Sequence, residues 1–219
     1  MKVVIFDFDG TLSIKRTNLW KSIWVELGYD VGAGSYYREL FKQFMEGKIT
    51  HPQWCNLTCK AFQEAGLTKK IFDKLVADTS LIDGAEELIK NLYNKDIAMH
   101  IVSGNIVEAI EKVLGDNAKY ITAINANHLV FNKDGTLEKI IGTKYDFEGK
   151  ATYIKELFDK KGYKKEEILF VGNSMNDEWV YQSGVKTLCV NPDDAQSDNT
   201  TVWNKTIHTD NLTEIEKEI

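Results

Sequence analysis

The chain has 219 residues, of which 43% are hydrophobic and 27% are charged, a composition typical of a globular protein large enough to bury one sizeable core. Its formal net charge of −6 argues against nucleic acid as the main partner, because binding to a phosphate backbone needs a basic surface. No apolar run approaches the roughly 20 residues that span a bilayer, the apolar N-terminal stretch is too short for a signal peptide, and three cysteines make no disulfide framework. We therefore expect a cytoplasmic protein with no membrane partner.

The first part of the chain predicts one buried strand followed by helices. The strand covers residues 2–8 and runs directly into Asp7-Phe8-Asp9-Gly10-Thr11. From Thr17 to about Asp78 the apolar residues recur at helical spacing. Three helices in this stretch are predicted to end at Gly28, near Gly47 and at Gly66, and the third begins at Thr50-His51-Pro52, where proline is tolerated in a first turn.

After Asp83-Gly84 the pattern changes to alternating helices and strands. In chain order we expect helix 84–95, strand 97–103, helix 105–114, helix 150–161, strand 168–171, helix 176–183 and strand 185–190, with a last helix over 212–219. Asp134-Gly135, flanked by strand formers over residues 126–138, predicts a β-hairpin between the two units. The alternation predicts an α/β fold with a Rossmann-like parallel sheet and helices on both faces.

Polar residues follow three of the predicted strands. Asp7 and Asp9 follow the first, Ser103-Gly104-Asn105 the second, and Gly172–Asp177 a later one. In open α/β sheets, ligands bind beyond the carboxyl ends of the strands. Two neighbouring carboxylates repel each other unless a cation or a shared proton intervenes, and hard oxygen ligands favour Mg2+. Taken singly, each motif is ordinary turn or capping chemistry; together they favour one carboxylate attacking a phosphate and the other transferring protons.

The order of these motifs resembles the haloacid dehalogenase superfamily and, within it, the phosphatases that are similar to phosphoserine phosphatase. Asp7–Thr11 matches the first family motif, Ser103 the second, Lys150 the third and Gly172–Asp177 the fourth. The resemblance covers nearly the whole chain. It implies a catalytic core of residues 1–13 and 80–219, a helical cap of residues 14–79 inserted after the first strand, and a flap formed by the hairpin.

The resemblance also implies roles for individual residues. Asp7 would be the nucleophile that forms an aspartyl-phosphate, Asp9 the acid/base, and Lys150 the cation that offsets charge in the transition state. Mg2+ would be held by Asp7, by the backbone carbonyl of Asp9, and by the fourth-motif residues. The residues expected at the metal are Asp7, Asp9, Asn173 and Asp177, and those expected at the phosphate are Thr11, Ser103, Gly104, Lys150 and Asn176.

Three positions depart from the family pattern. The fourth motif usually begins Gly-Asp, whereas here Asn173 brings an amide oxygen without a charge. Phosphoserine phosphatases carry an early cap Glu for the substrate amine and a later Arg for its carboxylate; the matching residues here are Arg16 and Thr58. We therefore expect a substrate other than phosphoserine, with an anionic or hydroxyl-rich group contacting Arg16. The alternative is that Arg16 points to solvent as a hinge residue, as long Arg side chains mostly do.

Cap residues His51, Cys55 and Cys59 lie at successive helical turns and are interpreted as core or pocket lining, with His51 placed to touch the substrate. The prediction is a Mg2+-dependent phosphomonoester hydrolase that acts on a small phosphorylated metabolite, as a monomer or homodimer. Two alternatives stay open: a phosphotransferase or mutase on the same core, and a non-catalytic phosphate-binding protein, which Asn173 favours.

Overall fold

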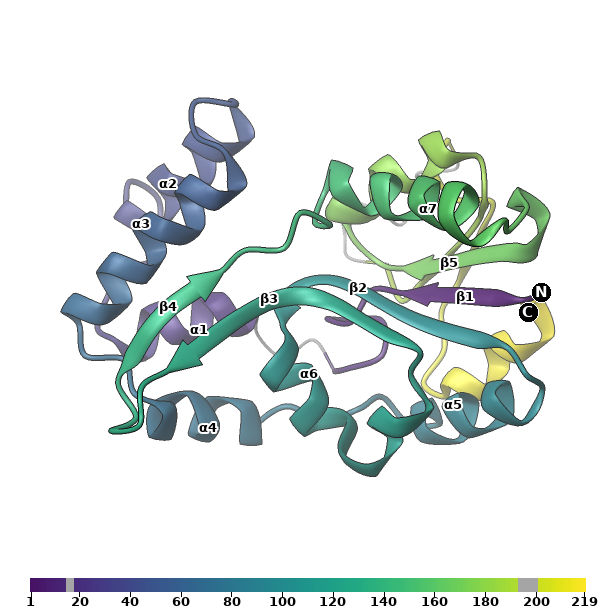
Figure 1. The fold of residues 1–219 in the computed structure, drawn as a ribbon, viewed down its shortest axis with the longest axis horizontal. Coiled ribbons are helices and arrows are strands. Elements are labelled where there is room, and N and C mark those ends of the chain that lie inside the picture. Colours follow the sequence, from purple (N-terminus) through teal and green to yellow (C-terminus); the bar gives the residue numbers. More distant parts are fainter. Residues whose placement is uncertain (15–17, 193–200) are drawn as a thin grey trace.

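The computed structural model describes residues 1–14, 18–192 and 201–219. Its centre is a seven-stranded sheet in the order β4-β3-β2-β1-β5-β6-β7, in which only the β3–β4 pairing is antiparallel. The strands are β1 (Val3–Phe6), β2 (Ala98–Ile106), β3 (Ala123–Phe131), β4 (Leu137–Ile141), β5 (Ile168–Gly172), β6 (Lys186–Val190) and β7 (Lys205–Ile207). The predicted α/β architecture is confirmed, and Figure 1 shows helices on both sides of the sheet.

The helices fall into two groups along the chain. Those of the insert are α1 (Leu19–Glu26), α2 (Tyr36–Met45), α3 (His51–Glu64) and α4 (Lys69–Ala77). Those that alternate with the strands are α5 (Ala85–Asn94), α6 (Val107–Leu114), η1 (Gly115–Tyr120), α7 (Glu148–Lys161), η2 (Lys165–Glu167), η3 (Met175–Ser183) and η4 (Leu212–Glu218), where η marks a 3-10 helix. Helix α3 begins as its sequence predicts, because Thr50 and Gln53 form a capping box around a first turn that contains Pro52.

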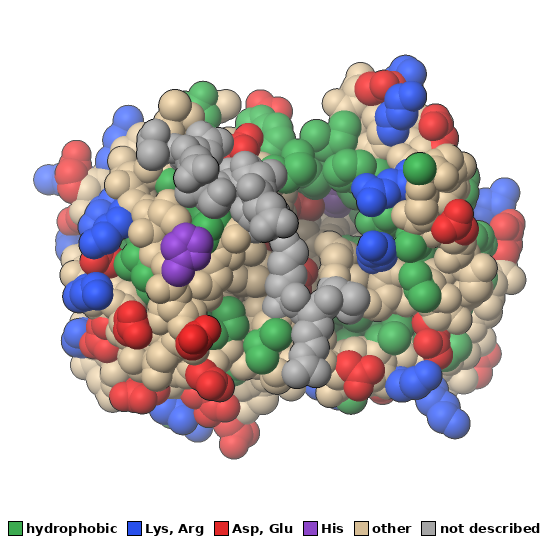
Figure 2. Space-filling view, turned by 180° about the vertical axis from the view of Figure 1, so that it is seen from behind, with side chains coloured by type: hydrophobic (Ala, Val, Ile, Leu, Met, Phe, Trp, Pro, Cys, Tyr) green, Lys and Arg blue, Asp and Glu red, His purple; other side chains and the backbone are tan. Residues whose placement is uncertain are grey.

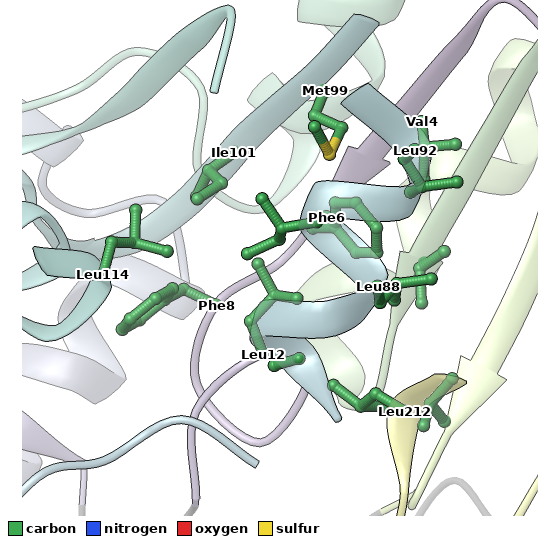
Figure 3. Close-up of a cluster of buried hydrophobic side chains, with 14 of the residues drawn as sticks. Val4, Phe6, Phe8, Leu12, Leu88, Leu92, Met99, Ile101, Leu114 and Leu212 are labelled. Carbon is green, nitrogen blue, oxygen red and sulfur yellow. The ribbon is translucent and has the colours of Figure 1, made fainter. Parts of the chain in front are cut away.

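The two faces of β1 point into two different hydrophobic clusters, because successive side chains of a strand alternate. Val4 and Phe6 pack with α5, α6 and η4, as the close-up in Figure 3 shows, whereas Val3 and Ile5 pack with α7. All four side chains are fully buried. Burial on both faces explains why this strand is a continuous apolar run, and it fixes the position of the residues that follow it.

A third hydrophobic cluster joins the insert to the hairpin. Buried side chains of α1, α3 and α4, among them Trp24 and Phe62, pack against Leu137 and Ile140 of β4 and against Ala109 of α6. The predicted hairpin is therefore present, with its strands at the edge of the main sheet and one face covered by the insert. Cys55 and Cys59 also belong to this cluster, as their interpretation as lining predicted.

The chain enters and leaves the insert through two segments that lie side by side. The backbone N–H of Ile14 donates to the carbonyl of Ser80 at 2.9 Å, and that of Ile82 donates to the carbonyl of Leu12 at 2.9 Å. We propose that this paired crossing is the boundary between a core of residues 1–13 and 80–219 and a cap of residues 14–79.

Several elements differ from their predicted extent. Strand β2 continues to Ile106, three residues past its predicted end, because Ile106 pairs with Asn127 of β3 after a register irregularity. Helix α6 therefore starts at Val107 and not at residue 105. The elements expected as α-helices near residues 176–183 and 212–219 are 3-10 helices. Among the described residues, no helix is long and apolar enough to cross a membrane.

Gly84 and Gly66 offer a matched test of close packing at a left-handed glycine. Both have φ of +78°. A Cβ at Gly84 would collide with the side chain of Asn211, whereas a Cβ at Gly66 would have no described atom within 4 Å. We expect Gly66→Ala to lower the free energy of unfolding by about 1 kcal/mol through its backbone conformation alone. Gly84→Ala should cost about 1 kcal/mol more, because Asn211 would lose its capping bond to Thr213 N. Urea denaturation of both variants measures the difference, and equal losses would contradict the clash.

Candidate active site

A cavity of about 280 Å³ lies at the carboxyl ends of β1 and β2, between the core and the insert. Figure 2 shows the corresponding hollow between two lobes of the molecule, with hydrophobic side chains gathered along its upper rim. Its core side is polar and includes Asp7, Asp9 and Ser103, and its insert side is largely aromatic. The strand ends thus bring together the first two predicted motifs, as expected for an open parallel sheet.

Lys150 links the first and fourth motifs through two buried ion pairs. Its Nζ donates to Oδ1 of Asp7 at 2.9 Å and to Oδ1 of Asp177 at 2.5 Å. The Lys150 side chain is fully buried, and its burial opposes the ammonium charge, but the carboxylates of Asp177, Asp7 and Asp146 outweigh this effect and raise its pKa. Lys150 therefore remains a cation across the physiological pH range and holds one oxygen of Asp7 in place.

Both oxygens of Asp177 have partners in the described structure. Oδ1 accepts from Lys150, and Oδ2 accepts from the backbone N–H groups of Asn173 and Ser174 at 3.0 and 3.1 Å. A Cβ at Gly172 would meet Asp177 Oδ2 at 2.5 Å, so the glycine leaves room for this carboxylate. Asp177 thereby ties the loop after β5 to Lys150.

Asp9 is oriented by Asn105, at the end of β2. The Asn105 amide Nδ2 donates to Oδ1 of Asp9 at 2.7 Å, and its own Oδ1 accepts from the backbone N–H of Ile106 at 2.6 Å. Asn105 is buried, whereas Asp9 is partly exposed to the cavity. A carboxyl group held in this way faces the cavity in one orientation.

The amide of Asn173 is only partly satisfied. Thr11 Oγ1 donates to Asn173 Oδ1 at 3.5 Å, and Asn173 Nδ2 is buried without a hydrogen-bond partner. Amide oxygen and nitrogen are assigned from their surroundings, so the unpaired end of this buried amide can be its oxygen, which suits a group that binds a cation. Among the described residues no three His, Cys, Asp or Glu side chains converge as a metal cluster.

Asp146 is a cavity residue that the sequence reasoning missed. Its Oδ1 accepts from the backbone N–H of Phe147 at 2.9 Å and from Asn176 Nδ2 at 3.3 Å. Its other oxygen lies against Gly104, where any Cβ would collide with it. Burial raises the pKa of Asp146, while Lys150 lowers it. The one signal that could have pointed to this residue is its position four residues before Lys150, just ahead of the N-cap of α7.

The insert contributes His51 and several rings to the cavity. His51 lies beside Cys55, with Sγ to Nδ1 at 3.8 Å, and burial lowers the pKa of its imidazole, which is therefore neutral near pH 7. Trp20 Nε1 donates to the carbonyl of Gly104 at 2.8 Å, a direct bond between the insert and the core. Burial also raises the pKa of Cys55 to about 12, so this thiol is inert at neutral pH.

All but one of the predicted site residues lie in or beside this cavity. Asp7, Asp9, Ser103, Gly104, Asn176 and His51 line it, and Thr11, Lys150, Asn173 and Asp177 stand directly behind them. Arg16 lies outside the described residues. Thr58 lines the cavity as well. Besides Asp146, sequence reasoning assigned no role to Asn105 or to Asn127, whose amide donates to the carbonyls of Gly104 and Asn105.

Comparison with known proteins identifies the family. Residues 4–190 match the model of the haloacid dehalogenase-like hydrolases. Phosphoserine phosphatase of Methanocaldococcus jannaschii is 26% identical over 197 residues, 87% of each chain. Phosphoserine phosphatase of Campylobacter jejuni subsp. doylei is 29% identical over 192 residues, which cover 85% of this chain and 86% of the relative.

Solved structures show the same fold. A phospho-aspartyl intermediate analogue of phosphoserine phosphatase superposes with a TM-score of 0.75 at 24% identity, over 100% of this chain and 98% of the other. A substrate-bound phosphoserine phosphatase complex gives a TM-score of 0.74 at 23% identity over the same shares. With the match to the family model and the curated relatives, these findings establish that the chain belongs to the haloacid dehalogenase-like hydrolases and is a phosphatase of that family.

Proposed function

We propose that the protein is a Mg2+-dependent phosphomonoester hydrolase that acts on a small phosphorylated metabolite through an aspartyl-phosphate on Asp7. The observation that carries the proposal is the arrangement of the two carboxylates at one cavity. Oδ1 of Asp7 is held by Lys150, and Oδ1 of Asp9 is held by Asn105. One carboxylate is thus positioned for attack and the other for proton transfer.

Each residue has a definite part in the proposed reaction. The second oxygen of Asp7 attacks phosphorus, the bond from phosphorus to the ester oxygen breaks, and Asp9 gives its proton to the departing alcohol. Water then attacks the aspartyl-phosphate, Asp9 takes up the proton, and inorganic phosphate leaves with Asp7 restored. Ser103, Gly104 and Asn176 bind the phosphoryl oxygens, and Lys150 offsets the charge that develops on them.

Asp7, the backbone carbonyl of Asp9 and Asn173 are the groups that would hold Mg2+. Bound there, the ion would offset the repulsion between the Asp7 carboxylate and the anionic phosphate. Asp177 has both oxygens engaged, by Lys150 and by two backbone N–H groups, so we assign it the support of this site and not direct ligation. The amide of Asn173 can bind Mg2+ through oxygen but contributes no charge.

Phosphoserine is not the proposed substrate, although the relatives carry that name. The cavity presents Thr58 where a cation for an amino-acid carboxylate is expected. Among the lining residues that the structure describes there is no Lys or Arg. A substrate carboxylate in this cavity would be repelled by the carboxylates of Asp7, Asp9 and Asp146, which line it.

Asp7→Asn should lower the rate of phosphate release from p-nitrophenyl phosphate more than about thousandfold, because an amide cannot serve as the attacking group. The fold should persist, since an amide oxygen still accepts from Lys150. Asp159→Asn, an exposed change of the same kind on α7, is the matched control and should keep the wild-type rate. Absence of Mg2+-dependent turnover in the wild type would overturn the function itself, and a residual Asp7→Asn rate above this bound would overturn the nucleophile.

Asn173→Asp should tighten Mg2+ binding by roughly tenfold or more, because it adds a formal charge to the proposed ligand set. Titration of activity and of intrinsic fluorescence with Mg2+ measures the change. Asn56→Asp, exposed on α3, is the control for the added charge alone. Unchanged or weaker Mg2+ binding in Asn173→Asp would place Asn173 away from the ion.

Lys150→Met should lower the free energy of unfolding by about 3–5 kcal/mol at pH 8, because it leaves the buried carboxylates of Asp7 and Asp177 without their cation. The loss should shrink toward pH 5, since burial already raises the pKa of Asp177 and removal of the cation raises it further, so that this carboxyl group becomes neutral as pH falls. Urea denaturation in EDTA at the two pH values tests this, with Lys155→Met, exposed on the same helix, as control. A loss independent of pH would point to packing alone.

A further inference from the structure

The side of the cavity that would receive the leaving group is aromatic. Its ring lining consists of Trp20, Trp24, Tyr37, Phe41, Trp54 and Phe147. Trp24 is almost fully buried in the insert, whereas the other five side chains are partly exposed. A surface of this kind binds either an apolar group or a weakly hydrated cation, because ring faces carry partial negative charge.

Asp146 distinguishes these two occupants. It is the one acidic residue of the described lining that the proposed chemistry does not use. Lys150 acts on Asp146 from a distance and lowers its pKa, but within the described residues no Lys or Arg lies inside 4 Å of this carboxylate. Its hydrogen-bond partners are the Phe147 backbone and the Asn176 amide. A neutral apolar ligand would cover this carboxylate without a cation in direct contact, which is costly, whereas a cationic ligand would offset that cost.

The rings and Asp146 meet near one point of the core. Gly104 accepts a hydrogen bond from Trp20 and has the Asp146 carboxylate against its Cα. Phe147 follows Asp146 directly and packs on Phe44 at 5.2 Å between ring centroids, and Phe44 in turn stacks on Trp54 at 4.9 Å. Trp20 and the Asp146 carboxylate therefore both contact Gly104, where the phosphoryl group is expected, and Phe147 and Trp54 line the same cavity.

Building on the proposed function, we infer that the leaving alcohol carries a small alkylated ammonium group, held between these rings and Asp146. The ammonium lies only a short linker away from the ester oxygen, because Asp146 also contacts Asn176, which is expected at the phosphoryl group. A cavity of about 280 Å³ suits such a compact ester. Rings in place of further hydrogen-bond acceptors favour an alkylated ammonium over a primary one.

This inference departs from the expectation that Arg16 would select an anionic or hydroxyl-rich group. Arg16 lies outside the described residues. The described lining contains carboxylates and aromatic rings but no Lys or Arg, so it favours a cationic group. An ester with a distal carboxylate, such as phosphoglycolate, is therefore a decisive additional probe.

The test compares phosphocholine with its uncharged carbon isostere, 3,3-dimethylbutyl phosphate, by kcat/KM at saturating Mg2+. The two leaving groups share size and shape, so the ratio of the two values reports the charge. We expect the wild type to prefer phosphocholine by roughly 30-fold or more. Asp146→Asn should reduce this ratio by roughly tenfold, and any difference in intrinsic reactivity cancels between the two enzymes. Asp159→Asn is the matched control and should keep the wild-type ratio.

Calorimetry with the Asp7→Asn protein gives a second readout, because it measures binding of the same two esters without turnover. Tighter binding of phosphocholine is expected there too. A ratio near one in wild type, tighter calorimetric binding of phenyl phosphate than of phosphocholine, or a preference for phosphoglycolate would overturn the cation while leaving the hydrolase intact. Failure to hydrolyse any ester, p-nitrophenyl phosphate included, would instead overturn the proposed function.

Discussion

The buried ion pairs of Lys150 with Asp7 and Asp177 are the interaction on which the arrangement of the site depends. They connect the end of β1, the first turn of α7 and the loop after β5, three segments far apart in the sequence. Burying a charge is expensive unless it is paired, so none of the three side chains can move alone. The ion pairs therefore fix the positions of Asp7 and of the loop that carries Asn173.

Local sequence signals and the order of the strands explain which parts of the site could be predicted from the sequence. The apolar run of β1, the Asp134-Gly135 turn and the proline-led start of α3 are local signals, and the elements they predict are present. The motif residues could be grouped because parallel strands end at one edge of the sheet. Asp7 and Ser103 were grouped in this way, whereas Lys150, which lies in a helix, came only from the resemblance to the family motifs.

What the sequence could not supply depends on contacts between distant segments. Asn105 becomes the partner of Asp9 only because β2 extends to pair with β3, and no local pattern marks that extension. Asp146 reaches the cavity through the turn at Phe147, which has φ of +49°, and through the missing side chain at Gly104. The 3-10 character of η3 and η4 was equally hidden, because an apolar spacing over so few residues does not separate the two helix types.

In the proposed function, the polar groups at the strand ends carry the chemistry, whereas the rings together with Asp146 select the leaving group, and the two are coupled through the low polarity of the cavity. In the proposed reaction, a substrate bound against the rings would displace water from the space next to Asp7 and so strengthen the pull of Lys150 on a developing charge. The same loss of water would make the Asp146 carboxylate costly to cover without a cation in contact with it. The cost of desolvating the Asp146 carboxylate gives the enzyme its selectivity, because only a substrate that carries a positive charge offsets that cost. On this view the aromatic rings of the lining and Asp146 recognise the leaving group together. Replacing either the rings or Asp146 should weaken discrimination between charged and neutral leaving groups more than it weakens phosphoryl transfer.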